Sequence, residues 1–153
     1  MSQSARILVI DDEETIRKTL SLILSHAGYV VDTAENGKQA IEKAEANFYN
    51  LALVDVRLPD MDGTELLIAM RETTPKMVKI ILTGYPGLQN AVKAINNGVD
   101  YYLIKPANTD ELLRVIKESL NIQAHEAETD EKKIVQFVET RLKKLESEEY
   151  PAL

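Results

Sequence analysis

Five side chains suited to phosphoryl chemistry stand directly after the apolar segments of this 153-residue chain. They are Asp11, Asp12, Asp55, Thr83 and Lys105. Each stands at the end of a short, mostly apolar run that is typical of a buried β-strand. If these strands are parallel, their carboxyl ends meet at one edge of the sheet, where the ligands of open α/β sheets bind. The sequence therefore predicts one site that combines three carboxylates, a hydroxyl and an ammonium.

The charges of this predicted site indicate its chemistry. Two carboxylates about 4 Å apart repel by about 4 kcal/mol at an effective dielectric constant near 20, so cations must accompany them. Mg²⁺ prefers hard oxygen ligands and is commonly held by one or two carboxylates with water and phosphate. Lys105 adds an ammonium and Thr83 a hydroxyl donor. Asp55 would then be the nucleophile that takes up a phosphoryl group as an acyl phosphate.

The elements that must position these residues can be read from the apolar periodicity. We expect strands at residues 7–10, 29–34, 51–54, 78–82 and 101–104, each followed by a helix. Gly28 is expected to end the first helix, Pro75 to stop the third, Pro86 to open the fourth and Thr109 to cap the fifth. This alternation predicts an α/β fold, a doubly wound five-stranded parallel sheet with helices on both faces.

Composition excludes several classes of protein. The formal net charge of −7 argues against direct binding of nucleic acid by the whole chain. The absence of cysteine excludes a disulfide framework, a thiol nucleophile and a cysteine–zinc site. Neither a membrane-spanning run nor a signal-peptide pattern is present, so we expect no membrane partner and a soluble, cytoplasmic protein.

Four motifs resemble those of the response-regulator receiver domain of two-component signal transduction. They are Val9-Ile-Asp-Asp12, Asp55-Val-Arg-Leu-Pro-Asp-Met-Asp-Gly63, Leu82-Thr-Gly84 and Asp100-Tyr-Tyr-Leu-Ile-Lys-Pro106, and the resemblance covers residues 5–121. It implies a flavodoxin-like sheet with strand order 2-1-3-4-5. It also implies a phosphorylation-activated switch whose phosphoryl group comes from a sensor histidine kinase, a histidine phosphotransfer protein or a small phosphodonor. Such a domain would catalyse only its own phosphorylation and dephosphorylation.

The resemblance gives each site residue a role, with Asp55 as the phosphoacceptor. The implied Mg²⁺ ligands are Asp11, Asp12, Asp55 and the backbone carbonyl of Arg57, with Asp12 bound directly and Asp11 partly through water. Thr83 and Lys105 would bind the phosphoryl oxygens, and Tyr102 would turn inward when Thr83 moves. Tyr101 competes for this last role, and strand alternation places the two tyrosines on opposite faces of the sheet.

Two other functions fit parts of the pattern. Aspartyl-nucleophile phosphatases carry a second acid two residues after the nucleophile, and this chain has Arg57 at that place. A receiver-like module that binds partners without phosphorylation would not need all five site positions, which are filled here. A phosphoacceptor switch therefore accounts for more of the sequence than either alternative.

The receiver domain is expected to span residues 1–122, followed by a tail at 123–153. In this tail, the acidic linker around 123–130 is either a hinge or a continuation of the preceding helix. Beyond it, Val135, Val138, Leu142 and Leu145 recur at helical spacing among Lys and Glu, which predicts an amphipathic helix. We expect this helix to pair in a homodimer together with the face of the fourth and fifth helices. The alternatives are that it folds back on the receiver or begins a truncated output region.

Overall fold

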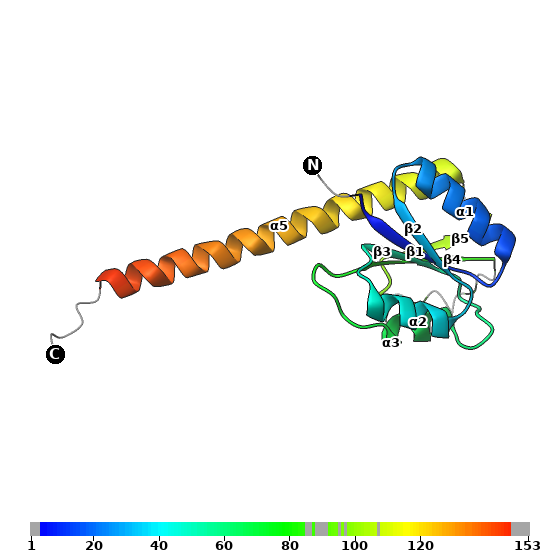
Figure 1. Ribbon diagram of the computed structural model, residues 1–153, viewed down its shortest axis with the longest axis horizontal. Coiled ribbons are helices and arrows are strands. Elements are labelled where there is room, and N and C mark those ends of the chain that lie inside the picture. Colours follow the sequence, from blue (N-terminus) through cyan, green and yellow to red (C-terminus); the bar gives the residue numbers. More distant parts are fainter. Residues whose placement is uncertain are drawn as a thin grey trace.

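A five-stranded parallel sheet forms the centre of the domain (Figure 1). The computed structural model describes residues 4–84, 87, 92–94, 96, 98–106 and 108–147. The strands are β1 (Arg6–Ile10), β2 (Val30–Ala34), β3 (Leu51–Val54), β4 (Val78–Thr83) and β5 (Tyr101–Ile104). Their order is β2-β1-β3-β4-β5, which confirms the predicted topology.

Helices cover both faces of this sheet (Figure 1). They are α1 (Glu14–His26), α2 (Gly37–Ala46), α3 (Gly63–Ala69) and α5 (Thr109–Ser147). Alternate residues of β1 point to opposite faces: Leu8 and Ile10 pack on the α2–α3 side, whereas Ile7 and Val9 pack on the α1–α5 side. Both faces are apolar, as a parallel sheet between two helical layers requires.

Helix boundaries differ from the prediction at two places. α1 ends as expected before Gly28, whose φ of 100° suits glycine. α3 already ends at Ala69, well before Pro75. The cap of α5 is Asn108 and not Thr109, because the Asn108 side chain accepts hydrogen bonds from the backbone amides of Asp110 and Glu111. The predicted fourth helix, expected to open at Pro86, falls mostly outside the described residues, of which 92–94 and 96 are helical.

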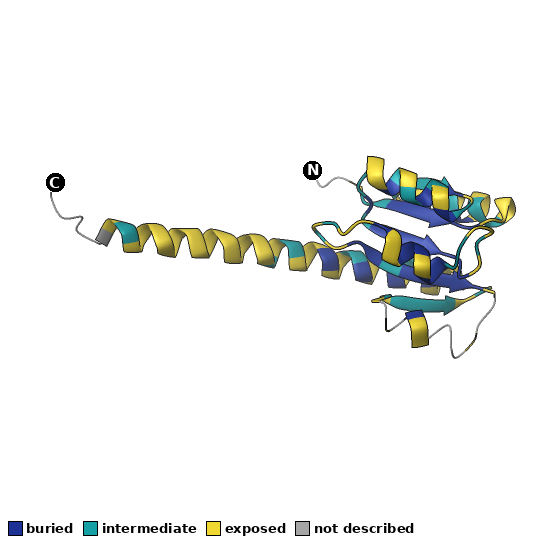
Figure 2. Ribbon diagram, turned by 90° about the horizontal axis from the view of Figure 1, so that it is seen from below, coloured by how far each residue is buried: buried dark blue, intermediate teal, exposed yellow. Residues whose placement is uncertain are grey.

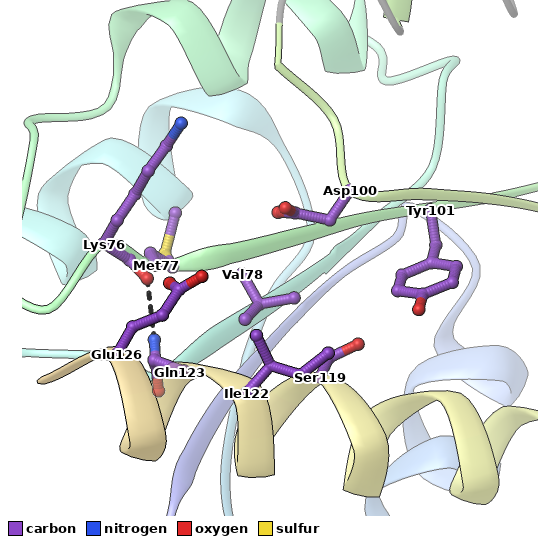
Figure 3. Close-up of a pocket in the computed structure, with 9 residues that line it drawn as sticks. All are labelled: Lys76, Met77, Val78, Asp100, Tyr101, Ser119, Ile122, Gln123 and Glu126. Carbon is purple, nitrogen blue, oxygen red and sulfur yellow. Dashed lines mark hydrogen bonds between the residues drawn. The ribbon is translucent and has the colours of Figure 1, made fainter. Parts of the chain in front are cut away.

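A buried glutamine fixes α5 to the sheet edge opposite the predicted site. The Gln123 amide donates hydrogen bonds to the carbonyl oxygens of Asn50 (2.9 Å) and Lys76 (2.8 Å) and accepts one from the Asn50 side chain (3.2 Å). Figure 3 shows it beside a cavity of about 240 Å³ between α5 and the start of β4. This cavity lies at the wrong end of the strands to take part in chemistry at their carboxyl ends.

The tail continues α5 without interruption. Of the two alternatives for residues 123–130, the structure therefore has the helical continuation, and the expected C-terminal helix is the far end of α5. Figure 2 shows that this part projects away from the sheet and its helices and is almost entirely exposed. Among the described residues, no helix is both long enough and apolar enough to cross a membrane.

Candidate functional site

The predicted site residues meet at the carboxyl edge of the sheet. Asp11 follows β1, Asp55 follows β3, Thr83 ends β4 and Lys105 follows β5. β1 and β3 are neighbours, and so are β3, β4 and β5, which brings the side chains from four strands together. Asp11, Asp55 and Thr83 are buried, with exposed fractions of 3%, 4% and 0%. The sheet order thus explains why residues 94 positions apart in sequence make direct contact.

Asp55 is held from three directions. Its Oδ2 atom lies 3.0 Å from the Lys105 ammonium. Its Oδ1 atom accepts hydrogen bonds from the Thr83 hydroxyl (3.3 Å) and from the backbone amide of Arg57 (3.1 Å). These donors fix the carboxylate at the carboxyl end of β3. Two of them, Thr83 and Lys105, come from the ends of β4 and β5.

Asp11 shares the ammonium of Lys105. Lys105 Nζ lies 2.5 Å from Asp11 Oδ2, and Asp11 Oδ1 accepts a hydrogen bond from the Glu13 amide at 2.9 Å. Burial raises the pKa of Asp11, and the contacts with Lys105 and Glu13 offset only part of this effect. Burial alone would lower the pKa of Lys105, but its hydrogen bonds to Asp11 and Asp55 outweigh burial and raise that pKa. One ammonium therefore stabilises two buried carboxylates.

The carboxylates of Asp11, Asp12 and Asp55 fit a divalent cation. One oxygen from each lies within 4.8 Å of the others. The Asp12 side chain is exposed, and within the described part of the chain no protein donor contacts its carboxylate. Clustered carboxylate oxygens with access to water are the ligand set that Mg²⁺ prefers. Of the three carboxylates, that of Asp12 is therefore the most available to a metal ion.

Three further residues support the site and were not identified from the sequence. The Arg17 guanidinium donates a 2.7 Å hydrogen bond to the Asp11 carbonyl, which holds the turn after β1. Gly63 passes so close to Asp55 that a Cβ atom would lie 2.2 Å from the Asp55 carbonyl oxygen. Asp60, in the loop after β3, accepts hydrogen bonds from the first amides of α2. The Asp-Gly pair at 62–63 was a usable signal for Gly63, whereas the contacts of Arg17 and Asp60 depend on the tertiary fold.

The two tyrosines of β5 lie on opposite faces of the sheet. Tyr101 packs in the cluster on the α1–α5 side, and Tyr102 packs on the α2–α3 side. The Tyr102 hydroxyl is buried and has no hydrogen-bond partner within the described residues. An orphaned buried hydroxyl is costly, which singles out Tyr102 as the unusual member of the pair.

Comparison with known proteins agrees with this geometry. The family profile of the response regulator receiver domain matches residues 7–117. The chain is 33% identical to the regulatory protein AtoC of Escherichia coli over 84% of its length, and 35% identical to the response regulator ArlR of Staphylococcus saprophyticus over 85%. The chain spans only 28% of AtoC and 59% of ArlR.

Solved structures give the same result. The crystal structure of a CheY-like response regulator receiver domain protein from Methanospirillum hungatei is 44% identical, with a TM-score of 0.78, and the match covers 81% of this chain and 99% of that one. The solution structure of the beryllofluoride-activated NtrC4 receiver domain dimer is 37% identical, with a TM-score of 0.72, and the match covers 77% of this chain and 98% of that one.

Proposed function

Because the chain belongs to the response regulator receiver domain family, we propose that it is a phosphorylation-activated switch in which Asp55 accepts the phosphoryl group. The observation that supports this most directly is the triple contact of Asp55 with Lys105, Thr83 and the Arg57 amide. A buried carboxylate beside an ammonium and a hydroxyl is poised for phosphoryl transfer, which depends on positioning and charge neutralisation. We also propose a cytoplasmic location and no catalysis beyond the domain's own phosphorylation and dephosphorylation.

Each site residue has a separate role in the proposed phosphoryl transfer. A carboxylate oxygen of Asp55 forms a bond to phosphorus as the bond between phosphorus and the donor's leaving atom breaks, which leaves an acyl phosphate. The Lys105 ammonium then faces the new phosphoryl oxygens, and the Thr83 hydroxyl donates to one of them. The direct ligand of Mg²⁺ would be Asp12, with Asp11 acting partly through water and with Asp55 and the Arg57 carbonyl completing the protein's set. The bound ion would neutralise charge on the phosphoryl oxygens.

The proposed donor is a sensor histidine kinase or a histidine phosphotransfer protein, with small phosphodonors as substitutes. A largely apolar groove of about 380 Å³ runs between α1 and the start of α5, and Lys105 lies at its edge. Ile16, Leu20 and Leu112 are among its lining residues. A protein docked there would place a phosphohistidine next to Asp55 while its own apolar side chains cover the groove.

Phosphorylation is proposed to act through Thr83, Tyr102 and self-association. The new phosphoryl group carries about −1.5 to −2 charges at neutral pH, which attracts the Thr83 hydroxyl and the Lys105 ammonium. Movement of Thr83 would leave space for Tyr102 to change position. Because the NtrC4 relative is described as an activated receiver dimer, we also propose a homodimer for this chain.

Labelling with acetyl phosphate and Mg²⁺ tests the phosphoacceptor. We expect one added phosphoryl group that hydroxylamine removes, and no labelling of Asp55→Asn. Asp110→Asn serves as the matched control, because Asp110 is exposed at the start of α5 and is not one of the clustered carboxylates. Undiminished labelling of Asp55→Asn would refute the assignment. Thr83→Ala should still accept the phosphoryl group but lose the change in the NMR shifts of β5 and α5 that follows phosphorylation.

The competing phosphatase function has less support. Its general acid would stand two residues after the nucleophile, where Arg57 donates its backbone amide to Asp55. Arginine cannot supply a proton at neutral pH. Turnover of a phosphate ester such as p-nitrophenyl phosphate that depends on Asp55 would favour the phosphatase over the switch.

A further inference from the structure

The far part of α5 presents a large apolar surface to water. Ile134, Val135, Phe137, Val138 and Leu142 have exposed fractions of 64%, 50%, 72%, 47% and 53%. They fall within nine consecutive residues, and Leu145 adds a sixth large apolar side chain nearby. So concentrated an exposed apolar surface on one helix marks an interaction site.

Four of these side chains form a narrow line along the helix, called here the seam. The seam consists of Val135, Val138, Leu142 and Leu145, at the 3-4-3 spacing that places residues on one side of a helix. Figures 1 and 2 show this segment projecting away from the receiver, so the receiver of the same chain does not cover it. The partner of the seam must come from another molecule.

We infer that the seam pairs with the seam of a second copy of this chain, side by side and in parallel, and this deepens the homodimer of the proposed function. In parallel register, each apolar layer meets the identical layer of the second copy. Arg141 precedes Leu142 and Glu146 follows Leu145, so they flank the seam on its two sides. They lie five positions apart in sequence, which is the spacing of the interhelical charge pairs in parallel coiled coils. Each Arg141 therefore faces Glu146 of the second copy.

The pairing is confined to the far part of the helix. Continuing the seam toward the receiver at the same spacing leads to Glu131 and Glu128, both exposed. In a parallel pair these carboxylates would face their own copies, and like charges across a helix interface destabilise it. The two helices therefore join at Val135 and stay apart between there and the receivers.

A short seam suffices here because the helix already exists. An isolated helix of this length pays a large nucleation cost before it can pair. In this chain the same helix begins at Thr109, is capped by Asn108 and is fixed by Gln123, so residues 135–145 continue an established helix. Association then needs only burial of the seam, and we expect a concentration-dependent equilibrium at micromolar protein.

An anionic membrane is the main alternative partner. The segment carries Lys132, Lys133, Arg141, Lys143 and Lys144, and a basic amphipathic helix can lie on such a surface. However, carboxylates also border the seam, since Glu139 follows Val138 and Glu146 follows Leu145. An anionic lipid surface would repel these groups, whereas a second copy can pair Glu146 with an arginine. Charge complementarity therefore favours the second copy.

Sedimentation equilibrium of the full chain tests the inference. Val138→Asp should weaken dimerisation by at least about tenfold, because it buries a charge in the seam. Phe137→Ala is the matched control, since Phe137 is more exposed but lies off the seam, and it should change the dimer dissociation constant less than about twofold. Glu131→Leu should strengthen dimerisation by at least about tenfold, because it removes a repulsion and lengthens the seam. Equal effects of the Val138 and Phe137 variants would refute the seam, as would a monomeric Glu131→Leu variant.

Cysteine cross-linking tests the direction, because the chain has no native cysteine. Leu145→Cys should form an interchain disulfide readily on mild oxidation, and Glu128→Cys should form little. A disulfide that appears only when Val135→Cys and Leu145→Cys chains are mixed would indicate antiparallel pairing and overturn the inference. So would binding to vesicles of anionic lipid by a chain that stays monomeric. Dimerisation through the seam should persist in Asp55→Asn. The seam proposal can therefore be refuted while the phosphorylation of Asp55 is supported, and the phosphorylation proposal can be refuted while the seam is supported.

Discussion

Replacing Lys105 by methionine should destabilise the receiver in a way that Mg²⁺ reverses. The ammonium contacts Asp11 at 2.5 Å and Asp55 at 3.0 Å, and both carboxylates are nearly inaccessible to water. At an effective dielectric constant near 20, one such contact is worth about 5 kcal/mol before desolvation is subtracted. Removing one partner of a buried ion pair costs about 3–5 kcal/mol. Because Lys105 keeps some exposure, we expect a loss of about 3 kcal/mol, or roughly 10 °C in Tm.

The sign of the Mg²⁺ effect separates electrostatics from packing. Lys105→Met leaves two facing carboxylates without a cation, so a divalent ion should stabilise this variant more than the wild type. Thermal unfolding of both proteins in EDTA and in millimolar Mg²⁺ measures the difference. Lys18→Met is the control, because Lys18 pairs with Glu14 on the exposed face of α1 and should change the free energy of unfolding by less than about 0.5 kcal/mol. An equal loss of Tm for Lys105→Met in both buffers would refute the reasoning.

Four other changes test the surroundings of the site. Asp12→Ala should weaken Mg²⁺ binding in a calorimetric titration by at least about tenfold more than Asp11→Ala, because Asp11 is already engaged by protein donors; equal losses would contradict this. Gly63→Ala should lower the free energy of unfolding by about 1–3 kcal/mol and slow the proposed phosphorylation, since its Cβ would collide with the backbone of Asp55; urea unfolding and labelling rates check it. Asp60→Ala should cost about 1 kcal/mol at neutral pH through the lost cap of α2. Hydrogen bonds from the α2 amides lower the pKa of Asp60 from its ordinary value of 3.8. The stabilisation by Asp60 is therefore fully present above pH 3.8 and is lost as the pH falls through the lower pKa of the folded state. Urea unfolding at several pH values would detect this loss. Tyr102→Phe should raise the free energy of unfolding by about 1 kcal/mol, because it deletes an unpaired buried hydroxyl; a lower Tm would show that the hydroxyl has a partner.

The positions of the strands and the clustering of the site residues could be predicted from the sequence, because both follow from local patterns of residue types. Apolar runs such as Leu51–Val54 mark buried strands, and polar residues at their ends meet once the strands are parallel. The order of the strands came from the family resemblance and not from periodicity. The metal role of Arg57 and the switch role of Tyr102 likewise came from resemblance, and they stay predictions.

The features that sequence reasoning missed depend on contacts between distant segments. Asp60 caps a helix that begins 23 residues earlier, and no local rule connects the two. Gln123 looked like part of a polar linker, yet it is buried because it satisfies the carbonyl oxygens of Asn50 and Lys76. The cap of α5 was misplaced by one residue because Asn108 and Thr109 are both good N-caps, and only the geometry of the turn selects the first.

The contacts of Lys105 limit how phosphorylation can drive the switch. A shift from 1% to 99% of the active conformation requires about 5.5 kcal/mol of differential affinity. Lys105 already pairs with Asp11 and Asp55, so its contact with a phosphoryl group replaces existing interactions and adds only their difference. Thr83 makes a long 3.3 Å hydrogen bond to Asp55 and can gain a stronger, charge-assisted one. The Tyr102 hydroxyl has no partner among the described residues, and in the proposed switch a rearrangement would relieve the penalty of burying it. For the proposed switch we therefore expect most of the driving force to come from Thr83 and Tyr102, and we expect Lys105 mainly to make the proposed transfer feasible.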